Sequence, residues 1–176
     1  MAARSETATA VQAPPAPARA TPVVPAAAPA VPDLVLSRVF DAPPALVFRA
    51  WTDPALLARW LCCKDFTPLF AEADVRAGGA WRAGMRSPDG RDHISGGTYR
   101  EVVPPARLAF THAWEDAAGR LGHASLVTLT FADRPGGKTE MTFVQAGLAS
   151  AESRASHTGG WNESFDRLVE LLPKFA

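Results

Sequence analysis

The chain has 176 residues, in which 18 Lys and Arg balance 18 Asp and Glu, 47% are apolar and only 2 are Cys. That length suits one domain with a sizeable core, and zero net charge excludes the basic surface that nucleic acid or an anionic membrane requires. No apolar run approaches the roughly 18 residues that span a bilayer. We therefore expect a soluble globular protein that binds neither nucleic acid nor membranes.

Residues 1–32 contain seven of the 16 prolines, twelve alanines and no aromatic residue. Frequent Pro favours extended conformers, and Ala offers too little apolar area to offset the entropy of ordering. The composition predicts a disordered Ala/Pro-rich tail in front of a domain over residues 33–176. Prolines also interrupt every stretch that could serve as a secretory signal, which favours a cytoplasmic location.

Residues 34–41 alternate apolar and polar side chains, which predicts a first strand. Asp41 with Pro43 and Pro44 begins a short helix that carries apolar residues at helical spacing. Thr52 or Asp53 caps a second short helix, which has Pro54 at its first position. One strand followed by two short helices results.

From residue 67 to residue 147 the sequence consists of extended segments separated by Gly- and Pro-rich turns. Period-two alternation is clear in residues 81–86, 108–115 and 127–131. The short connections predict an antiparallel meander of about six strands with one face against a core.

The last segment predicts one amphipathic helix, with Ser150 as its N-cap and Pro173 at its end. Its apolar stripe has a period of about 3.6 residues and consists of His157, Trp161, Phe165, Leu168 and Leu172. Gly159 and Gly160 lie inside this helix. Either the helix begins or kinks there, or the missing side chains leave space beside the sheet.

Four short segments occur in an order that is typical of one superfamily. They are residues 38–43 (RVFDAP), 50–54 (AWTDP) with Trp60, 97–105 (GTYREVVPP) with Arg107-Leu108, and 157–161 (HTGGW). From about residue 33 onward the chain resembles the helix-grip START/birch-pollen-allergen superfamily (SRPBCC). The similarity is to its AHSA-type branch, the C-terminal domains of activators of the heat-shock chaperone ATPase. One departure is Leu61-Cys62-Cys63, where that branch more often has a second Trp followed by Gly or Ala and Pro.

The resemblance implies an α+β helix-grip fold, in which a curved antiparallel sheet of about seven strands wraps the long C-terminal helix. The space between sheet and helix is then the natural ligand cavity. The alternative is that the aromatic side chains of the sheet and helix fill this space as a packed core. The candidate ligand-binding residues are Trp81, Met85, Phe110, His112, Trp114, His157 and Trp161.

His157 is the most chemically suggestive of these residues, because a histidine can bind a ligand or transfer a proton near neutral pH. A structural role is the alternative, and His112 has the same ambiguity. His93 and His123 lie near turns and indicate little. Arg82 and Arg86 are expected on the solvent face of their strand.

Adjacent Cys62 and Cys63 would form only a strained disulfide, and no second pair of cysteines completes a zinc site. We expect both to be reduced and partly buried. No motif indicates a nucleophilic serine, a phosphate-binding loop or a metalloprotease. The sequence therefore predicts no metal, no cofactor and no catalytic residue.

The preferred interpretation is non-catalytic binding of a small apolar or amphipathic molecule in the interior. The second hypothesis is a protein-interaction module for a chaperone ATPase, in the stress response. It needs an outward-facing patch for the partner, and the only residues that suggest one are Lys64, Arg82 and Arg86. A cyclase-like or hydrolytic enzyme that uses His157 or His112 is the third. A cavity of at least about 300 Å³ favours ligand binding, a packed interior favours interaction, and a His–carboxylate pair favours catalysis. The oligomeric state stays open.

Overall fold

The computed structural model describes residues 31–175, and its elements follow the order expected from the sequence. The predicted strand, two short helices, six further strands and long terminal helix are all present. Their bounds are β1 (Leu34–Phe40), α1 (Pro44–Thr52), α2 (Pro54–Trp60), β2 (Thr67–Ala73), β3 (Ala80–Arg86), β4 (Asp92–Val103), β5 (Arg107–Trp114), β6 (Ser125–Arg134), β7 (Lys138–Ala146), α3 (Ala151–Leu171) and a final 3₁₀ turn η1 (Leu172–Lys174).

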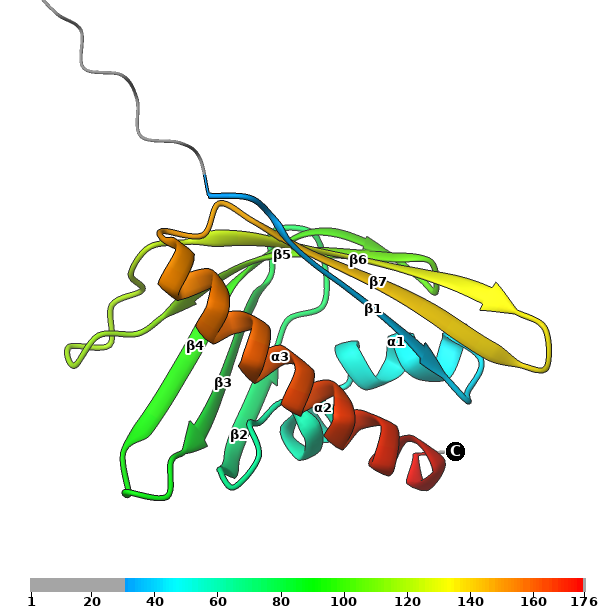
Figure 1. Cartoon of the computed structure of the whole chain (residues 1–176), viewed down its shortest axis with the longest axis horizontal. Helices are drawn as coiled ribbons and strands as arrows, with labels where there is room; N and C mark the ends of the chain where they lie inside the picture. The colour runs from blue at the N-terminus through cyan, green and yellow to red at the C-terminus, as the bar shows by residue number, and fades with distance from the viewer. Residues whose placement is uncertain (1–30, 176) are drawn as a thin grey trace, which may run out of the picture.

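The seven strands form one antiparallel sheet in the order β1-β7-β6-β5-β4-β3-β2. Strands β2 to β7 pair with their neighbours along the chain, as short turns require, and β1 pairs with β7 from Leu34 opposite Gln145 to Phe40 opposite Thr139. The sheet curves, and α3 runs across its concave side while α1 and α2 lie at one end (Figure 1). The α+β helix-grip fold is therefore confirmed.

The two short helices close one end of the core with two tryptophans. Asp53 caps α2 by accepting a hydrogen bond from the Ala55 backbone N–H at 2.9 Å. Trp51 and Trp60 are buried with their ring centroids 4.6 Å apart. The Trp60 indole N–H donates to the Ala50 carbonyl at 2.8 Å and fixes the ring against α1. Both tryptophans thus anchor the short helices.

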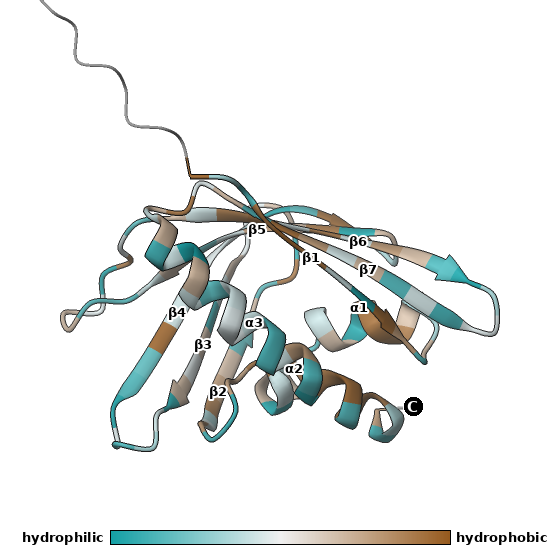
Figure 2. Cartoon of the chain, in the orientation of Figure 1, coloured by the Kyte–Doolittle hydropathy of each residue, from teal (hydrophilic) through white to brown (hydrophobic). Residues whose placement is uncertain are grey.

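Helix α3 begins at its predicted cap, where the Ser150 hydroxyl accepts from the Ser153 N–H at 3.0 Å. It continues through Gly159 and Gly160, so the helix does not begin at the glycines. The buried side of the helix faces the sheet, and hydrophobic and hydrophilic residues alternate around it and along the strands (Figure 2). That side carries Trp161, Ser164, Phe165 and Leu168, followed by Leu172 in η1.

A glycine allows an unusually close contact between β4 and β5. A Cβ atom at Gly97 would lie 1.8 Å from the Thr111 carbonyl oxygen, so only glycine fits there. The same oxygen accepts a hydrogen bond from the Trp81 indole N–H at 3.0 Å. The Gly-Thr-Tyr segment therefore has a packing role in the sheet.

The predicted tail of residues 1–32 falls almost entirely outside the described residues, of which Val31 and Pro32 are the first two. Val31 is half-buried and packs against the core. Within residues 31–175, no helix has both the length and the apolar character needed to cross a bilayer.

Candidate functional site

Small side chains leave a cavity between the sheet and the N-terminal half of α3. On the sheet, Ala83 of β3 pairs with Ser95 of β4, and both are buried. On the helix, Gly160 and Ser164 lie one turn apart, and the Ser164 hydroxyl donates to the Gly160 carbonyl at 2.9 Å. A Cβ at Gly160 would meet Cys63 Sγ at 3.4 Å. The cavity that results has a volume of about 400 Å³.

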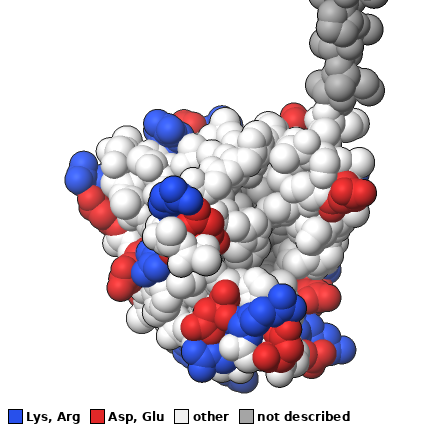
Figure 3. All heavy atoms as spheres, turned by 90° about the vertical axis from the view of Figure 1, so that its left-hand side faces the viewer, with Lys and Arg blue, Asp and Glu red and all other residues white. Residues whose placement is uncertain are grey.

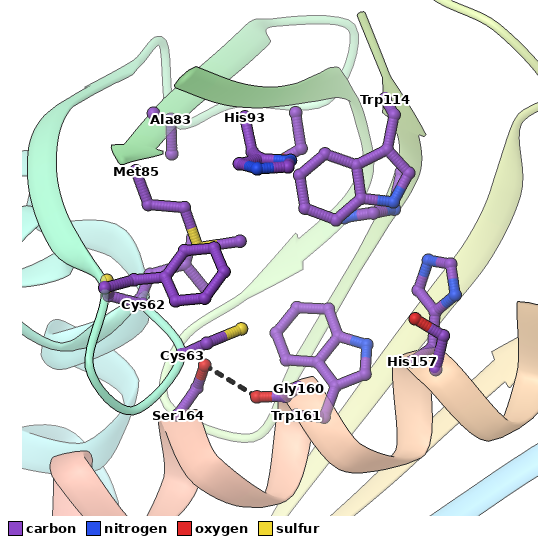
Figure 4. Close-up of a pocket in the computed structure, with 16 residues that line it drawn as sticks. Cys62, Cys63, Ala83, Met85, His93, Trp114, His157, Gly160, Trp161 and Ser164 are labelled. Atoms are coloured by element: carbon purple, nitrogen blue, oxygen red, sulfur yellow. Dashed lines mark hydrogen bonds between the residues drawn. The ribbon is translucent and has the colours of Figure 1, made fainter. Parts of the chain in front are cut away.

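Within residues 31–175, no Asp, Glu, Lys or Arg side chain lines this cavity. Sheet residues face helix residues across it, and the loop after α2 forms a third wall (Figure 4). The lining combines aliphatic side chains, Met85 and glycines with aromatic rings, thiols, small hydroxyls and three imidazoles: Leu61, Cys62, Cys63, Phe66, Ala83, Gly84, Met85, His93, Ser95, His112, Trp114, Ser156, His157, Gly160, Trp161 and Ser164.

The cavity brings together five of the seven candidate residues, namely Met85, His112, Trp114, His157 and Trp161. Trp114 is 39% exposed, which places it at the rim. Their binding role stays a prediction.

The other two candidates, Trp81 and Phe110, pack deeper in the core. Their ring centroids lie 5.3 Å apart, and they border a separate void of only about 10 Å³. The alternation of side chains along β3 and β5 correctly places Trp81 and Phe110 on the face of the sheet that is turned to the core. Their position along the strands puts them beyond the end of the larger cavity.

Several lining residues escape the sequence patterns, and each has a detectable signal. His93 lies near a turn, yet antiparallel pairing puts it opposite Met85. Ser156 and Ser164 lie four residues on either side of Gly160, where the sequence already allows space beside the sheet, and the three form a stripe of small residues beside the aromatic stripe of α3.

A buried chain of hydrogen bonds fixes the helix to three strands at the edge of the cavity. The Trp161 indole N–H donates to Gln145 Oε1 at 2.8 Å, and Gln145 Nε2 donates to Ser125 Oγ at 2.8 Å. Ser125 Oγ in turn donates to the His112 carbonyl at 3.1 Å. Because buried polar groups are costly unless paired, this network holds Trp161 and the backbone of His112 in place.

The two histidines at the cavity have different environments. The ring centroids of His112 and His157 lie 5.4 Å apart. His157 Nδ1 donates to the Ser153 carbonyl at 2.8 Å, one helical turn before it. His112 is only 5% exposed, and burial, with a smaller contribution from His157, lowers the pKa of His112 to about 3. The His112 ring is therefore neutral at physiological pH.

Both cysteines are free thiols, as expected, with Cys62 buried and Cys63 half-buried. Burial raises the pKa of Cys62 to about 11. Burial and the nearby Glu163 also raise the pKa of Cys63. Raised pKa values disfavour the thiolate that nucleophilic chemistry requires. Among residues 31–175, no group of three or more His, Cys, Asp or Glu side chains is arranged to hold a metal ion.

The charged side chains beside the cavity are engaged with one another. Arg82 makes two hydrogen bonds to Glu115 at 2.6 and 2.8 Å, and Arg86 makes two to Asp92 at 2.6 and 3.0 Å. On the face shown in Figure 3, acidic and basic groups lie next to one another around an uncharged, hollowed area. Two of the three cations proposed for a protein interface are thus already paired.

Several solved structures are similar to this chain. A protein from Chromobacterium violaceum is 33% identical, with 80% of this chain and 96% of that chain covered and a TM-score of 0.70. A protein from Rhizobium leguminosarum is 30% identical, with 81% of this chain and 95% of that chain covered and a TM-score of 0.64. The AHSA1 protein from Silicibacter pomeroyi is 26% identical, with 82% of this chain and 100% of that chain covered and a TM-score of 0.72. No curated protein matches the chain.

One protein family, described as "Activator of Hsp90 ATPase homolog 1-like protein", matches residues 41–173. The match begins at the end of β1 and extends through α3, so it contains every residue that lines the cavity. The chain belongs to the activator of Hsp90 ATPase homolog 1-like family, within the SRPBCC superfamily whose helix-grip fold it has.

Proposed function

We propose that the protein binds a small apolar or amphipathic molecule between the sheet and α3, without chemical conversion. The observation that carries this proposal is the uncharged cavity of about 400 Å³, within the range of about 300 to 1,000 Å³ typical of ligand sites. Aromatic rings supply apolar contact area, and imidazoles and hydroxyls supply a few polar contacts. The two free thiols suit a reducing compartment, which supports a cytoplasmic location.

Two features favour binding over catalysis at this site. The cavity lining contains no carboxylate that could pair with a histidine as an acid–base couple. Its two thiols have raised pKa values, which leaves them protonated and weakly nucleophilic. Each feature lowers the case for a hydrolytic or cyclase-like reaction.

An accessory role for a chaperone ATPase is the second candidate, and the family description is the observation that favours it. Such a role needs an accessible surface for the partner. Lys64 is exposed, whereas the guanidinium groups of Arg82 and Arg86 are paired with carboxylates. The cavity therefore supports the first candidate more strongly than this surface supports the second.

Two adjacent glycines of α3 provide a matched test of the cavity. Gly160 lines the cavity, whereas Gly159 is exposed, and a Cβ atom added to it would meet no other atom within 4 Å. Leucine at Gly160 fills the cavity, and leucine at Gly159 points to solvent. Both substitutions replace a helical glycine, so their intrinsic effects on the helix are equal.

The uncharged dye N-phenyl-1-naphthylamine reports binding through its fluorescence in an apolar site. We expect enhanced fluorescence with the wild type and with Gly159→Leu, and at least a tenfold loss of affinity with Gly160→Leu. Ala83→Leu fills the same cavity from the sheet and is the second variant if Gly160→Leu fails to fold. Absence of binding to the wild type, or equal binding to all folded variants, would contradict the proposal. Native mass spectrometry of the purified chain then searches for a molecule that co-purifies.

A further inference from the structure

The His112 imidazole is a buried polar group at the cavity that makes no hydrogen bond to another described residue. The His112 ring is 5% exposed and lines the cavity, and it makes no hydrogen bond to any other residue between 31 and 175. The Ser125 hydroxyl donates to the backbone carbonyl of His112 and not to its ring. Most buried polar side-chain atoms in proteins are hydrogen-bonded, so an unpartnered imidazole in a cavity needs an explanation.

The other two imidazoles of the cavity already have neighbours within hydrogen-bonding distance. His157 Nδ1 is held by the Ser153 carbonyl, and His93 Nε2 lies 3.2 Å from Ser87 Oγ. The hydroxyl of Ser164 is occupied by the Gly160 carbonyl. The His112 ring differs from these three groups in making no hydrogen bond to another residue between 31 and 175, so it can bind a guest in the cavity.

Aromatic rings hold the His112 imidazole in one position. Its centroid lies 5.4 Å from that of Trp114, 5.8 Å from that of Trp161 and 5.8 Å from that of Trp81. A ring that is fixed before binding loses little conformational freedom when a ligand arrives. The surrounding rings also favour a flat aromatic guest.

The lining disfavours ionic guests. Among the described residues, no Asp, Glu, Lys or Arg side chain lines the cavity, so a carboxylate or ammonium group would lose its hydration without meeting one of these side chains. The neutral His112 ring has one N–H donor and one nitrogen acceptor. A hydroxyl group, which both donates and accepts, suits either nitrogen.

We propose that the cavity selects an uncharged aromatic molecule that carries a hydroxyl group, and that the His112 ring recognises this group by a hydrogen bond. This inference rests on the proposed binding function and specifies the class of ligand. His112 then acts as a specificity-determining residue, while the aromatic walls supply most of the affinity.

The test compares three probes of the same bicyclic shape, namely 1-naphthol, naphthalene and 1-naphthoate. Each displaces N-phenyl-1-naphthylamine from the full chain at neutral pH, and its affinity is measured by competition. With the wild type we expect 1-naphthol to bind about tenfold more tightly than naphthalene, the size of one neutral hydrogen bond. The anion 1-naphthoate is expected to compete more weakly than either.

The substitution His112→Phe keeps an aromatic ring and removes both ring nitrogens. We expect it to abolish the advantage of 1-naphthol while it retains binding of naphthalene and of the dye. The control His123→Phe changes an exposed histidine whose Nε2 lies 2.7 Å from the Gly147 carbonyl, outside the cavity lining. It is expected to preserve the advantage.

A measurement on the wild type keeps the inference testable if His112→Phe does not fold. Nitrogen NMR of labelled histidine should show a shift of the His112 ring signals with 1-naphthol that naphthalene does not produce. Failure of the dye to bind would overturn the proposed function itself. A bound dye combined with equal affinities for 1-naphthol and naphthalene, or with an advantage that survives His112→Phe, would overturn only the role of His112.

Discussion

The two ends of α3 lie against the same sheet but meet very different interiors. Toward its C-terminus, Phe165 is fully buried, and its ring centroid lies 5.5 Å from that of Phe143 and 6.1 Å from that of Trp51. Toward its N-terminus, Gly160 faces the cavity that Ala83 and Ser95 line from the sheet. Side-chain size, and not a difference in backbone architecture, decides which end is a core and which is a pocket.

The division gives each end of the interior a different task. Close packing around Phe165 supplies dispersion and burial that stabilise the fold. The residues that line the cavity lack part of these contacts. The buried hydrogen bond from Trp161 to Gln145 lies between the two ends. Three measurements can break or sharpen this comparison.

The largest expected effect follows from truncation in the packed end. Phe165→Ala should lower the free energy of unfolding by about 3 to 5 kcal/mol, because it removes a fully buried ring and leaves a void. Met85→Ala at the cavity should cost less than about 2 kcal/mol, because Met85 is half-buried and already borders empty space. Urea unfolding of both variants measures the contrast, and equal losses would show that the two ends are packed alike.

A smaller effect should appear in the pH dependence of stability. The unfolded chain protonates His112 near pH 6.5, whereas burial keeps the pKa in the folded chain at about 3. The folded state thus binds fewer protons in this window, and stability falls as the pH decreases from 6.5 toward 3, by at most about 1.4 kcal/mol per pH unit.

His112→Phe removes this contribution, so its unfolding free energy should fall less steeply with acidification than that of the wild type. Urea unfolding at pH 7, 6 and 5 measures the two slopes, and the difference between them cancels the carboxylates common to both proteins. Parallel slopes would mean that the His112 ring is protonated as readily in the folded chain as in the unfolded one.

The smallest effect concerns the two helical glycines. Gly159→Ala should raise the unfolding free energy by about 1 kcal/mol, since alanine favours the helix and the new Cβ meets nothing within 4 Å. Gly160→Ala should give a similar or slightly smaller gain, because its Cβ meets Cys63 Sγ at 3.4 Å. Thermal unfolding measures both. A loss of stability at Gly160 alone would show that the cavity wall is rigid there.

Sequence patterns predicted the fold well because periodicity reports which face of an element is buried. Alternation in residues 81–86 and 108–115, and the helical stripe from His157 to Leu172, identified the strands and α3 correctly. Periodicity does not report depth along a strand, so it cannot separate Trp81 and Phe110, which lie in the core, from the residues that line the cavity.

The composition of the cavity was harder to predict, because a hollow depends on side chains that are small. Aromatic and titratable residue types indicate His112 and Trp161, and the glycine pair indicates space at Gly160, but neither pattern includes Ser156 or Ser164. The histidines also need coordinates, since sequence cannot show that His157 is held by its own helix while the His112 ring bonds no other residue between 31 and 175.

The third wall of the cavity comes from residues that follow α2. It includes Leu61-Cys62-Cys63, the segment in which the sequence departs from the Trp, Gly or Ala, and Pro more frequent in the branch. This corner is a connecting segment and belongs to neither the sheet nor α3. Connecting segments accept new residues more readily than packed elements do. Evolution can therefore reshape this wall for a different guest while the scaffold that carries it stays the same.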